Sequence, residues 1–227
     1  MEQFINKITL GDSRELIKQL PDECIDVIST DPPYGVNYQS GLRKDKFDVI
    51  AGDGEADFEI LSEFYRVLKP NSACYIYTSW HVYPQWVAEI AKHFDVKNMC
   101  IWSKGGGGMG DLEGAFAVDF EICIFAVKGR HILNSPRSGA IWKLRKDAGA
   151  EYVHPTQKPM SAMEWPMLKS TKPGDIVLDP YMGSGTTAMA ALNCNRQFIG
   201  FEIDPVYYAE ATKRVTNKAS APTMQFE

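Results

Sequence analysis

Short apolar runs with strand character alternate with amphipathic segments along this chain. Ile25–Thr30 is typical of a buried strand, whereas Ala56–Leu68 carries its apolar residues at helical spacing. Seven strands are expected, at Ile8–Leu10, Ile25–Thr30, Ala73–Thr78, Val96–Trp102, Asp119–Val127, Ile176–Leu178 and Phe198–Phe201. Between and after them, the expected helices are Ser13–Leu20, Ala56–Leu68, Tyr83–Phe94, Ser161–Thr171, a segment from about Thr186, and Pro205 to about Asn217. Such alternation predicts an α/β fold, a mostly parallel seven-stranded sheet with helices on both faces.

Composition excludes several classes of protein. A chain of 227 residues with 44% hydrophobic residues buries a complete core without disulfide or metal support. Five cysteines form no CxxC pair, and the four histidines have no metal-ligand spacing, so no metal site is expected. No apolar run approaches a membrane span and the first ten residues carry charges, which predicts a cytoplasmic protein with no membrane partner.

Acidic residues follow four of the expected strands. Asp12, Asp31, Asp179 and Glu202 come where a strand ends. Any one of them could be an ordinary turn or cap residue. Because ligands of open parallel sheets bind at the carboxyl ends of the strands, four acids at one edge predict a site for a ligand with hydroxyls, amines or positive charge.

A glycine-containing loop joins the strand at Ile176–Leu178 to an Ala-rich helix. Its sequence, DPYMGSGTT from Asp179 to Thr187, allows close approach of the backbone to a ligand at a helix N-terminus. It is no P-loop, since no Lys follows the last glycine, but it does fit the dinucleotide fingerprint, with Glu202 at a ribose-binding distance. A nicotinamide-dependent oxidoreductase is therefore a competing hypothesis. Only 25 residues follow Glu202, too few for a second βαβ half.

The tetrapeptide Asp31-Pro32-Pro33-Tyr34 suits a planar amine. Two prolines remove two N–H donors, so the backbone presents only carbonyls beside the Asp31 carboxylate. If Asp31 and the Pro32 carbonyl each accept one N–H, the lone pair of the amine is freed for attack, and the carboxylate stabilises the charge that grows on nitrogen. Tyr34 offers a stacking face. A rigid turn with a tyrosine anchor is the structural alternative.

Together these segments resemble the β-class DNA amino-methyltransferases, which use S-adenosylmethionine and have a Rossmann-like methyltransferase fold. DPPYG at 31–35 resembles their catalytic motif and DPYMGSGTT at 179–187 their cofactor loop. GD at 11–12, HPTQKP at 154–159 and FEID at 201–204 are similar to three further family elements, in the family's order. The resemblance covers nearly the whole chain and implies one catalytic domain over 1–227 with a short target-recognition insertion at about 128–153.

The resemblance also implies a set of site residues. The catalytic residues would be Asp31, Pro32, Pro33 and Tyr34. Those binding the cofactor would be Asp12, Ser13, Asp31, Thr156, Lys158, Asp179, Pro180, Tyr181, Met182, Gly183, Ser184, Gly185, Thr186, Glu202, Ile203 and Asp204. In the family, DPPY usually accompanies adenine N6 methylation, so adenine is favoured over cytosine N4. RNA or a protein amide as substrate, and a silent specificity subunit, remain alternatives.

A basic window at 128–146 interrupts this acidic chain. The net charge is −5, yet the window holds six Lys or Arg residues and no acid, where the family places target recognition. Double-stranded DNA is the expected partner, with the target base flipped out and stacked on Tyr34. The residues expected to contact DNA are Arg43, Lys44, Lys128, Arg130, Arg137, Lys143, Arg145 and Lys146. Recognition shared with a second subunit or a homodimer, and a setting in restriction-modification, stay open.

Proline 166 departs from the helical pattern around it. It falls inside the expected helix Ser161–Thr171, where an interior proline costs about 3 kcal/mol unless it begins a helical turn. The sequence therefore predicts a kink or a late helix start at Pro166.

Overall fold

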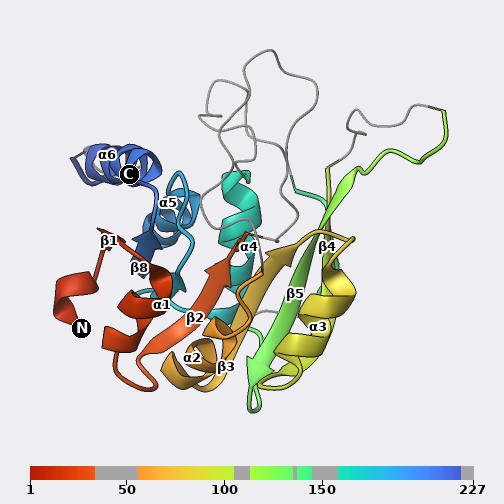
Figure 1. Cartoon of the computed structure of the whole chain (residues 1–227), viewed down its shortest axis with the longest axis horizontal. Helices are drawn as coiled ribbons and strands as arrows, with labels where there is room; N and C mark the ends of the chain where they lie inside the picture. The colour runs from red at the N-terminus through yellow and green to blue at the C-terminus, as the bar shows by residue number, and fades with distance from the viewer. Residues whose placement is uncertain (34–55, 105–112, 135–136, 145–157, 221–227) are drawn as a thin grey trace, which may run out of the picture.

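The strands form one mixed sheet in a computed structural model, which describes residues 1–33, 56–104, 113–134, 137–144 and 158–220. Within these ranges the sheet has eight strands in the order β1-β8-β7-β2-β3-β5-β4-β6. They are β1 (Lys7–Leu10), β2 (Ile25–Thr30), β3 (Leu68–Thr78), β4 (Asp95–Ser103), β5 (Phe120–Lys128), β6 (Ile141–Trp142), β7 (Ile176–Asp179) and β8 (Gln197–Glu202). Of these eight described strands, only β5 runs antiparallel to its neighbours (Figure 1).

The predicted α/β class is confirmed, with one strand more than expected. Strand β6 pairs in parallel with β4, Ile141 opposite Ile101 and Trp142 opposite Trp102. A two-residue strand is too short to show a sequence periodicity, which is why it was not predicted.

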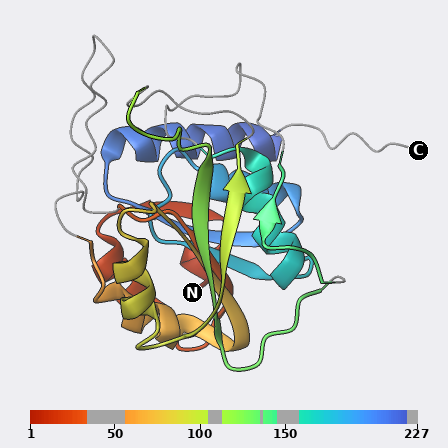
Figure 2. The ribbon, with the colours of Figure 1, turned by 90° about the vertical axis from the view of Figure 1, so that its right-hand side faces the viewer.

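Helices cover both faces of the sheet (Figure 2). The first group packs against one face and comprises α1 (Ser13–Leu16), the 3₁₀ turn η2 (Ile17–Gln19), α2 (Ile60–Val67) and α3 (Tyr83–Ile90). The second covers the other face and comprises α4 (Met160–Ser170), α5 (Thr186–Asn193) and α6 (Pro205–Ser220). A 3₁₀ turn, η1 (Glu2–Phe4), precedes β1. The chain thus has three layers, the arrangement predicted from the alternation of strands and helices.

The helix boundaries differ from the expected ones at several ends. α2 ends at Val67 because Leu68 becomes extended and pairs with Ile25 of β2. The expected helix Ser13–Leu20 is instead a four-residue α-helix followed by a 3₁₀ turn. Pairing with a strand overrides local propensity, because it satisfies backbone groups that a helix end leaves unpaired.

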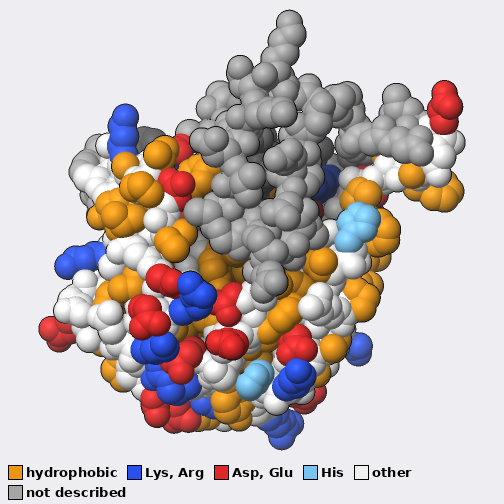
Figure 3. Space-filling model, in the orientation of Figure 1, with side chains coloured by type: hydrophobic (Ala, Val, Ile, Leu, Met, Phe, Trp, Pro, Cys, Tyr) orange, Lys and Arg blue, Asp and Glu red, His pale blue; other side chains and the backbone are white. Residues whose placement is uncertain are grey.

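The outer surface of the first helical layer is polar. Figure 3 shows Asp and Glu side chains interspersed with Lys and Arg on this face. Arg66 of α2 exemplifies the pattern, since it pairs with Asp22 at 2.7 Å and with Glu63 at 2.6 Å. On the described part of this face, acidic and basic side chains therefore lie close enough to pair.

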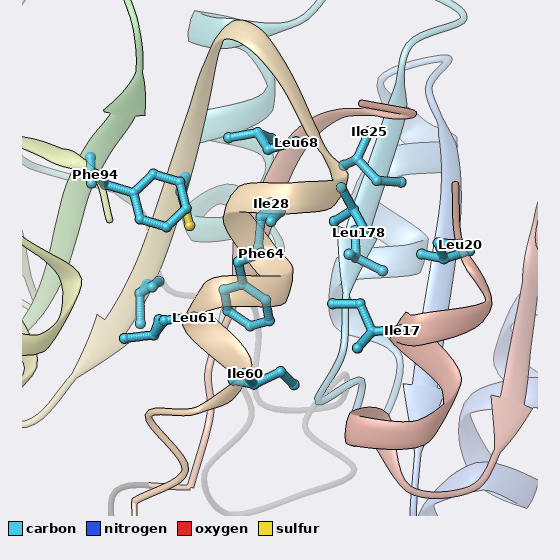
Figure 4. Close-up of a cluster of buried hydrophobic side chains, with 14 of the residues drawn as sticks. Ile17, Leu20, Ile25, Ile28, Ile60, Leu61, Phe64, Leu68, Phe94 and Leu178 are labelled. Carbon is cyan, nitrogen blue, oxygen red and sulfur yellow. The ribbon is translucent and has the colours of Figure 1, made fainter. Parts of the chain in front are cut away.

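Beneath this layer lies a buried apolar core. Figure 4 shows Phe64 and Leu61 of α2 in one cluster with Ile28 of β2 and Leu178 of β7. A second apolar cluster fills the other face, where Met163 and Met167 of α4 pack beneath the sheet. The two cores hold the central strands rigidly, so the residues that follow those strands are positioned by well-packed elements.

Candidate active site

Four carboxylates follow four consecutive neighbours in the sheet. Strands β1, β8, β7 and β2 are parallel and lie side by side, so their carboxyl ends share one edge. Asp12 follows β1, Glu202 ends β8, Asp179 ends β7 and Asp31 follows β2. The acidic edge predicted from the sequence is therefore present, in the spatial order Asp12, Glu202, Asp179, Asp31.

Asp179 is the most deeply buried of these acids, 2% exposed. Its Oδ1 accepts a hydrogen bond from Thr30 Oγ1 at 2.7 Å and one from the backbone N–H of Tyr181 at 3.1 Å. The Thr187 side chain also hydrogen-bonds to this carboxyl group. Burial raises the pKa of Asp179 to about 6, although these hydrogen bonds oppose the shift. A buried carboxyl that is costly to ionise is suited to bind a positively charged group.

The loop after Asp179 is shaped by α6. Gly185 has φ +85°, and a Cβ there would lie 3.0 Å from the Cβ of Ala211, so glycine is required at this turn. Arg214, also in α6, donates from Nη1 to the backbone carbonyl of Ser184 at 2.5 Å. The predicted cofactor-loop residues Pro180, Tyr181, Met182, Gly183, Ser184, Gly185 and Thr186 all lie between β7 and the first turn of α5.

A second glycine lets this loop cross the sheet. The side chain of Met182 is buried over Gly200 of β8, where any Cβ would collide with it. The backbone N–H of Met182 donates to the carbonyl of Phe201 at 2.9 Å. The loop is thereby fastened across β8, next to Glu202.

Both carboxylate oxygens of Glu202 accept hydrogen bonds from backbone N–H groups. Its Oε2 accepts from the N–H of Gly183 at 2.7 Å and its Oε1 from the N–H of Asp204 at 2.8 Å. The side chain is buried, and this burial raises its pKa. Asp204 accepts from the N–H of Val206 at the start of α6, while Ile203 is half exposed. Glu202 is held in a fixed orientation at the edge.

Asp12 has a structural partner of its own. It caps α1 by accepting from the N–H of Arg14 at 2.9 Å, and it pairs with the Arg14 guanidinium at 2.6 Å. These contacts lower the pKa of Asp12, chiefly through the side-chain hydrogen bond. Ser13 is buried and hydrogen-bonds to Tyr181, which links this corner to the glycine loop.

Asp31 lies at the end of a series of charges that the sequence did not predict. Lys158 Nζ is 2.6 Å from Asp31 Oδ2 and 2.7 Å from Glu121 Oε2. Lys104 Nζ is 2.7 Å from the other carboxylate oxygen of Glu121. Burial alone would raise the pKa of Glu121, but Lys158 and Lys104 outweigh it and hold this pKa below its usual range. Lys158 was predicted near the cofactor; the structure places it beside Asp31, the predicted catalytic carboxylate.

The sequence does contain a signal for Glu121. It stands in the apolar strand FEICIFAV, where an ionisable residue that becomes partly buried requires a charged partner. Which partner it has depends on a contact between residues far apart in the chain.

Pro166 is accommodated by a hydrogen bond from β3. Helix α4 begins at Met160 and continues through Pro166, so of the two predicted alternatives the late start is wrong and the kink stays a prediction. Proline lacks an N–H and leaves the carbonyl of Ala162 without its helical donor. The buried Tyr77 hydroxyl donates to this carbonyl at 2.6 Å, and the Tyr77 ring lies 5.2 Å from Lys158 Nζ. The proline therefore helps to orient a ring beside the charged residues.

The basic window is divided between two edges of the sheet. Because β5 is antiparallel, Lys128 lies opposite Ser72 at the start of β3, away from Asp31. Lys128 Nζ is bound there by the carbonyls of Leu68 at 2.8 Å and Tyr65 at 3.0 Å. Arg130 follows at the same edge, opposite the one that holds the four acids, and the DNA contacts predicted for Lys128 and Arg130 stay a prediction.

Lys143 is placed differently from the start of the window. It directly follows β6, which runs parallel to β4 and β3, and so lies at the edge where the acids gather. Its side chain is exposed, as is that of Arg137. The other predicted residues, Tyr34, Arg43, Lys44, Arg145, Lys146 and Thr156, lie outside the described residues.

The chemistry of these groups fits S-adenosylmethionine. Its ammonium and sulfonium are positive and its ribose carries hydroxyls, which match buried carboxylates at Asp179 and Glu202. Beside them, Asp31 is followed by two prolines without N–H donors. The fold and the site thus define a class: an α/β transferase with a cofactor site next to an acceptor for an amine.

Comparisons with known proteins identify the family. The family model described as DNA methylase matches residues 25–213. The chain is 30% identical to the DNA adenine methyltransferase YhdJ of Escherichia coli, over 90% of this chain and 81% of that protein. It is 29% identical to the type II methyltransferase M.HinfI of Haemophilus influenzae, over 95% and 69%. The M1.HpyAVI–SAM complex superposes with a TM-score of 0.75 at 27% identity, over 92% and 98% of the two chains. The chain belongs to the DNA methylase family of S-adenosylmethionine-dependent amino-methyltransferases.

Proposed function

We propose that this protein is a site-specific DNA methyltransferase that transfers the methyl group of S-adenosylmethionine to N6 of adenine. The observation that carries the proposal is the hydrogen bond between Thr30 and Asp179, 2.7 Å long. It joins the ends of β2 and β7, so Asp31 follows immediately on a residue bound to the expected cofactor carboxylate. A similar protein named as a DNA adenine methyltransferase supports adenine as the target.

The acceptor groups at the end of β2 suit attack by an exocyclic amine. When bound, S-adenosylmethionine supplies an electrophilic methyl group on a positive sulfur. Asp31 accepts one N–H of the amine and the Pro32 carbonyl accepts the other, which frees the nitrogen lone pair. The Asp31 carboxylate then stabilises positive charge that develops on this nitrogen. The transfer is direct: the nitrogen bonds to the methyl carbon as the bond from that carbon to sulfur breaks, the neutral thioether leaves, and the methylated amine loses one N–H proton. The chain supplies geometry and electrostatics.

Double-stranded DNA is the proposed partner, bound across the edge that holds the four acids. The chain acts as one catalytic domain with a short target-recognition insertion at about 128–153. Lys143 supports this placement, because it is exposed at the same edge as Asp31. So short an insertion fits a short recognition sequence, read by this chain alone or together with a second copy or subunit.

The direct test of function is expression in a host that lacks adenine methylation. Base-resolved sequencing of the host DNA should find N6-methyladenine at one sequence context. An empty vector provides the background. Methylation on cytosine N4 instead would contradict the adenine assignment and retain the enzyme class, whereas unmodified DNA from a folded, cofactor-binding protein would contradict both.

Asp31→Ala should abolish turnover and leave the dissociation constant of S-adenosylmethionine within a few-fold of the wild type. The reason is that Asp31 acts on the amine and not on the cofactor. Asp95→Ala, an exposed acid at the start of β4, is the matched control and should retain full activity. Methyl transfer would be followed with a duplex oligonucleotide and cofactor binding by calorimetry. Turnover that survives in Asp31→Ala would refute the mechanism.

A further inference from the structure

Two cations and two carboxylates alternate next to the target site. Asp31, Lys158, Glu121 and Lys104 follow one another with charged atoms 2.6 to 2.7 Å apart. The Lys158 side chain is 8% exposed, whereas those of the other three are 26 to 28% exposed. These residues come from the end of β2, the entry to α4, the start of β5 and the end of β4. Their meeting is a product of the tertiary fold.

In this arrangement, Lys158 and the target amine compete for Asp31. In the proposed function, Asp31 must accept an N–H from the target amine. Here one of its oxygens is 2.6 Å from the Lys158 ammonium, which is itself a strong hydrogen-bond donor. A cation bound tightly to Asp31 would occupy an acceptor oxygen and weaken the interaction of the carboxylate with the target amine.

Glu121 offers the ammonium an alternative partner. Its Oε2 lies 2.7 Å from Lys158 Nζ, nearly as close as the Asp31 oxygen. Lys104 binds the opposite oxygen of Glu121 and keeps the carboxylate oriented. The ring of Tyr77, fixed by its hydrogen bond to Ala162, lies beside the same ammonium. Lys158 can therefore move away from Asp31 and stay ion-paired with Glu121.

We propose that Glu121 is a positioning residue for methyl transfer. Lys158 is paired with both Asp31 and Glu121, and it stays paired with Glu121 when Asp31 accepts the N–H of the target amine. The inference rests on the proposed function, because it gives Asp31 the amine as its partner. Without the Glu121 charge, Lys158 binds Asp31 more tightly and the amine must displace it. The loss then appears in kcat and in the KM for DNA, and much less in cofactor binding.

The test compares Glu121→Gln with the wild type. Glutamine preserves size and removes the charge, and kcat should fall about 10- to 100-fold, while the dissociation constant of S-adenosylmethionine changes less than about threefold. Glu63→Gln is the matched control, since it breaks an ion pair of similar exposure in α2, and it should behave as the wild type. An unchanged kcat in Glu121→Gln would overturn the proposal.

Rescue separates positioning from general damage to the fold. Adding Lys158→Met to Glu121→Gln removes the competing cation, so the double variant should be several-fold more active than Glu121→Gln alone. Glu121→Asp retains the charge, so its kcat should lie between those of Glu121→Gln and the wild type. If Glu121→Gln fails to fold, the comparison of Glu121→Asp with the double variant tests the proposal. A double variant no more active than Glu121→Gln, or an Asp variant no better than Gln, would refute it. A wild type without adenine methylation would instead refute the proposed function.

Discussion

At the scale of single residues, the site depends on carboxylates kept in different environments. Asp12 is paired with Arg14, which lowers its pKa, whereas Asp179 is buried without a cationic partner within hydrogen-bonding range in the described residues, and its pKa rises to about 6. The pKa values of two acids at the same edge of the sheet are thus shifted in opposite directions. The cofactor's positive end favours the acid that lacks a cation of its own.

Asp179 predicts a pH dependence of stability. Its folded pKa of about 6 exceeds the unfolded value of 3.8, so the folded state binds more protons between these values. The free energy of unfolding should therefore fall as pH rises from about 4 to 6, by up to about 3 kcal/mol from this group. Urea unfolding at several pH values would measure it. In Asp179→Asn this part of the pH dependence should disappear, and identical slopes in both proteins would contradict the assignment.

The affinity for cofactor should change with pH in the opposite direction. A positive ammonium stabilises the ionised Asp179, so S-adenosylmethionine should bind more tightly as pH rises through about 6. Calorimetric titration of the wild type would show this trend, and Asp179→Asn should bind weakly with little pH dependence.

At the scale of elements, the carboxyl ends of parallel strands bring together residues that are far apart in the sequence. Asp12 and Glu202 are separated by 190 positions, yet β1 and β8 are neighbours, with Leu10 opposite Glu202. A periodicity argument identified both strands and the acids after them. The order of the strands could not be read from any single segment, because pairing partners are chosen by the packing of the whole sheet.

Helix α4 and strand β3 are coupled through Pro166. Tyr77→Phe removes the donor to the Ala162 carbonyl and should lower the free energy of unfolding by about 1–3 kcal/mol. Adding Pro166→Ala supplies a backbone N–H for the same carbonyl, so the double variant should be less destabilised than the sum of the single changes predicts. Urea unfolding of all four proteins would measure the coupling. Strict additivity would show that the two residues act independently.

At the scale of the whole molecule, the net charge of −5 conceals an uneven distribution. Acids line the carboxyl edge of the parallel strands. The basic window is divided, with Lys143 at this edge and Lys128 and Arg130 at the opposite one. None of the helices in the described ranges is long and apolar enough to span a membrane. The sequence predicted one basic surface for the window, because the order of residues along the chain does not show that β5 runs antiparallel to its neighbours.

The division of the window predicts different effects on DNA binding. Lys143→Ala should weaken binding and reduce the slope of log K against log salt by about 1, because one phosphate contact is lost. Arg130→Ala removes an equal charge from the opposite edge and should leave the slope unchanged. Binding of a duplex at several salt concentrations would measure both. Equal effects of the two substitutions would contradict the placement of the DNA.

The sequence by itself determined the layers, the acidic edge and the two motifs that define the family. These depend on local information: periodicity, turn chemistry and the residue that ends each strand. Only the tertiary structure decided that Lys158 binds Asp31, that Glu121 shares it, and that Tyr77 completes the helix at Pro166. The physical reason is that a buried charge or carbonyl requires a partner, while the identity of that partner depends on which distant segments pack together.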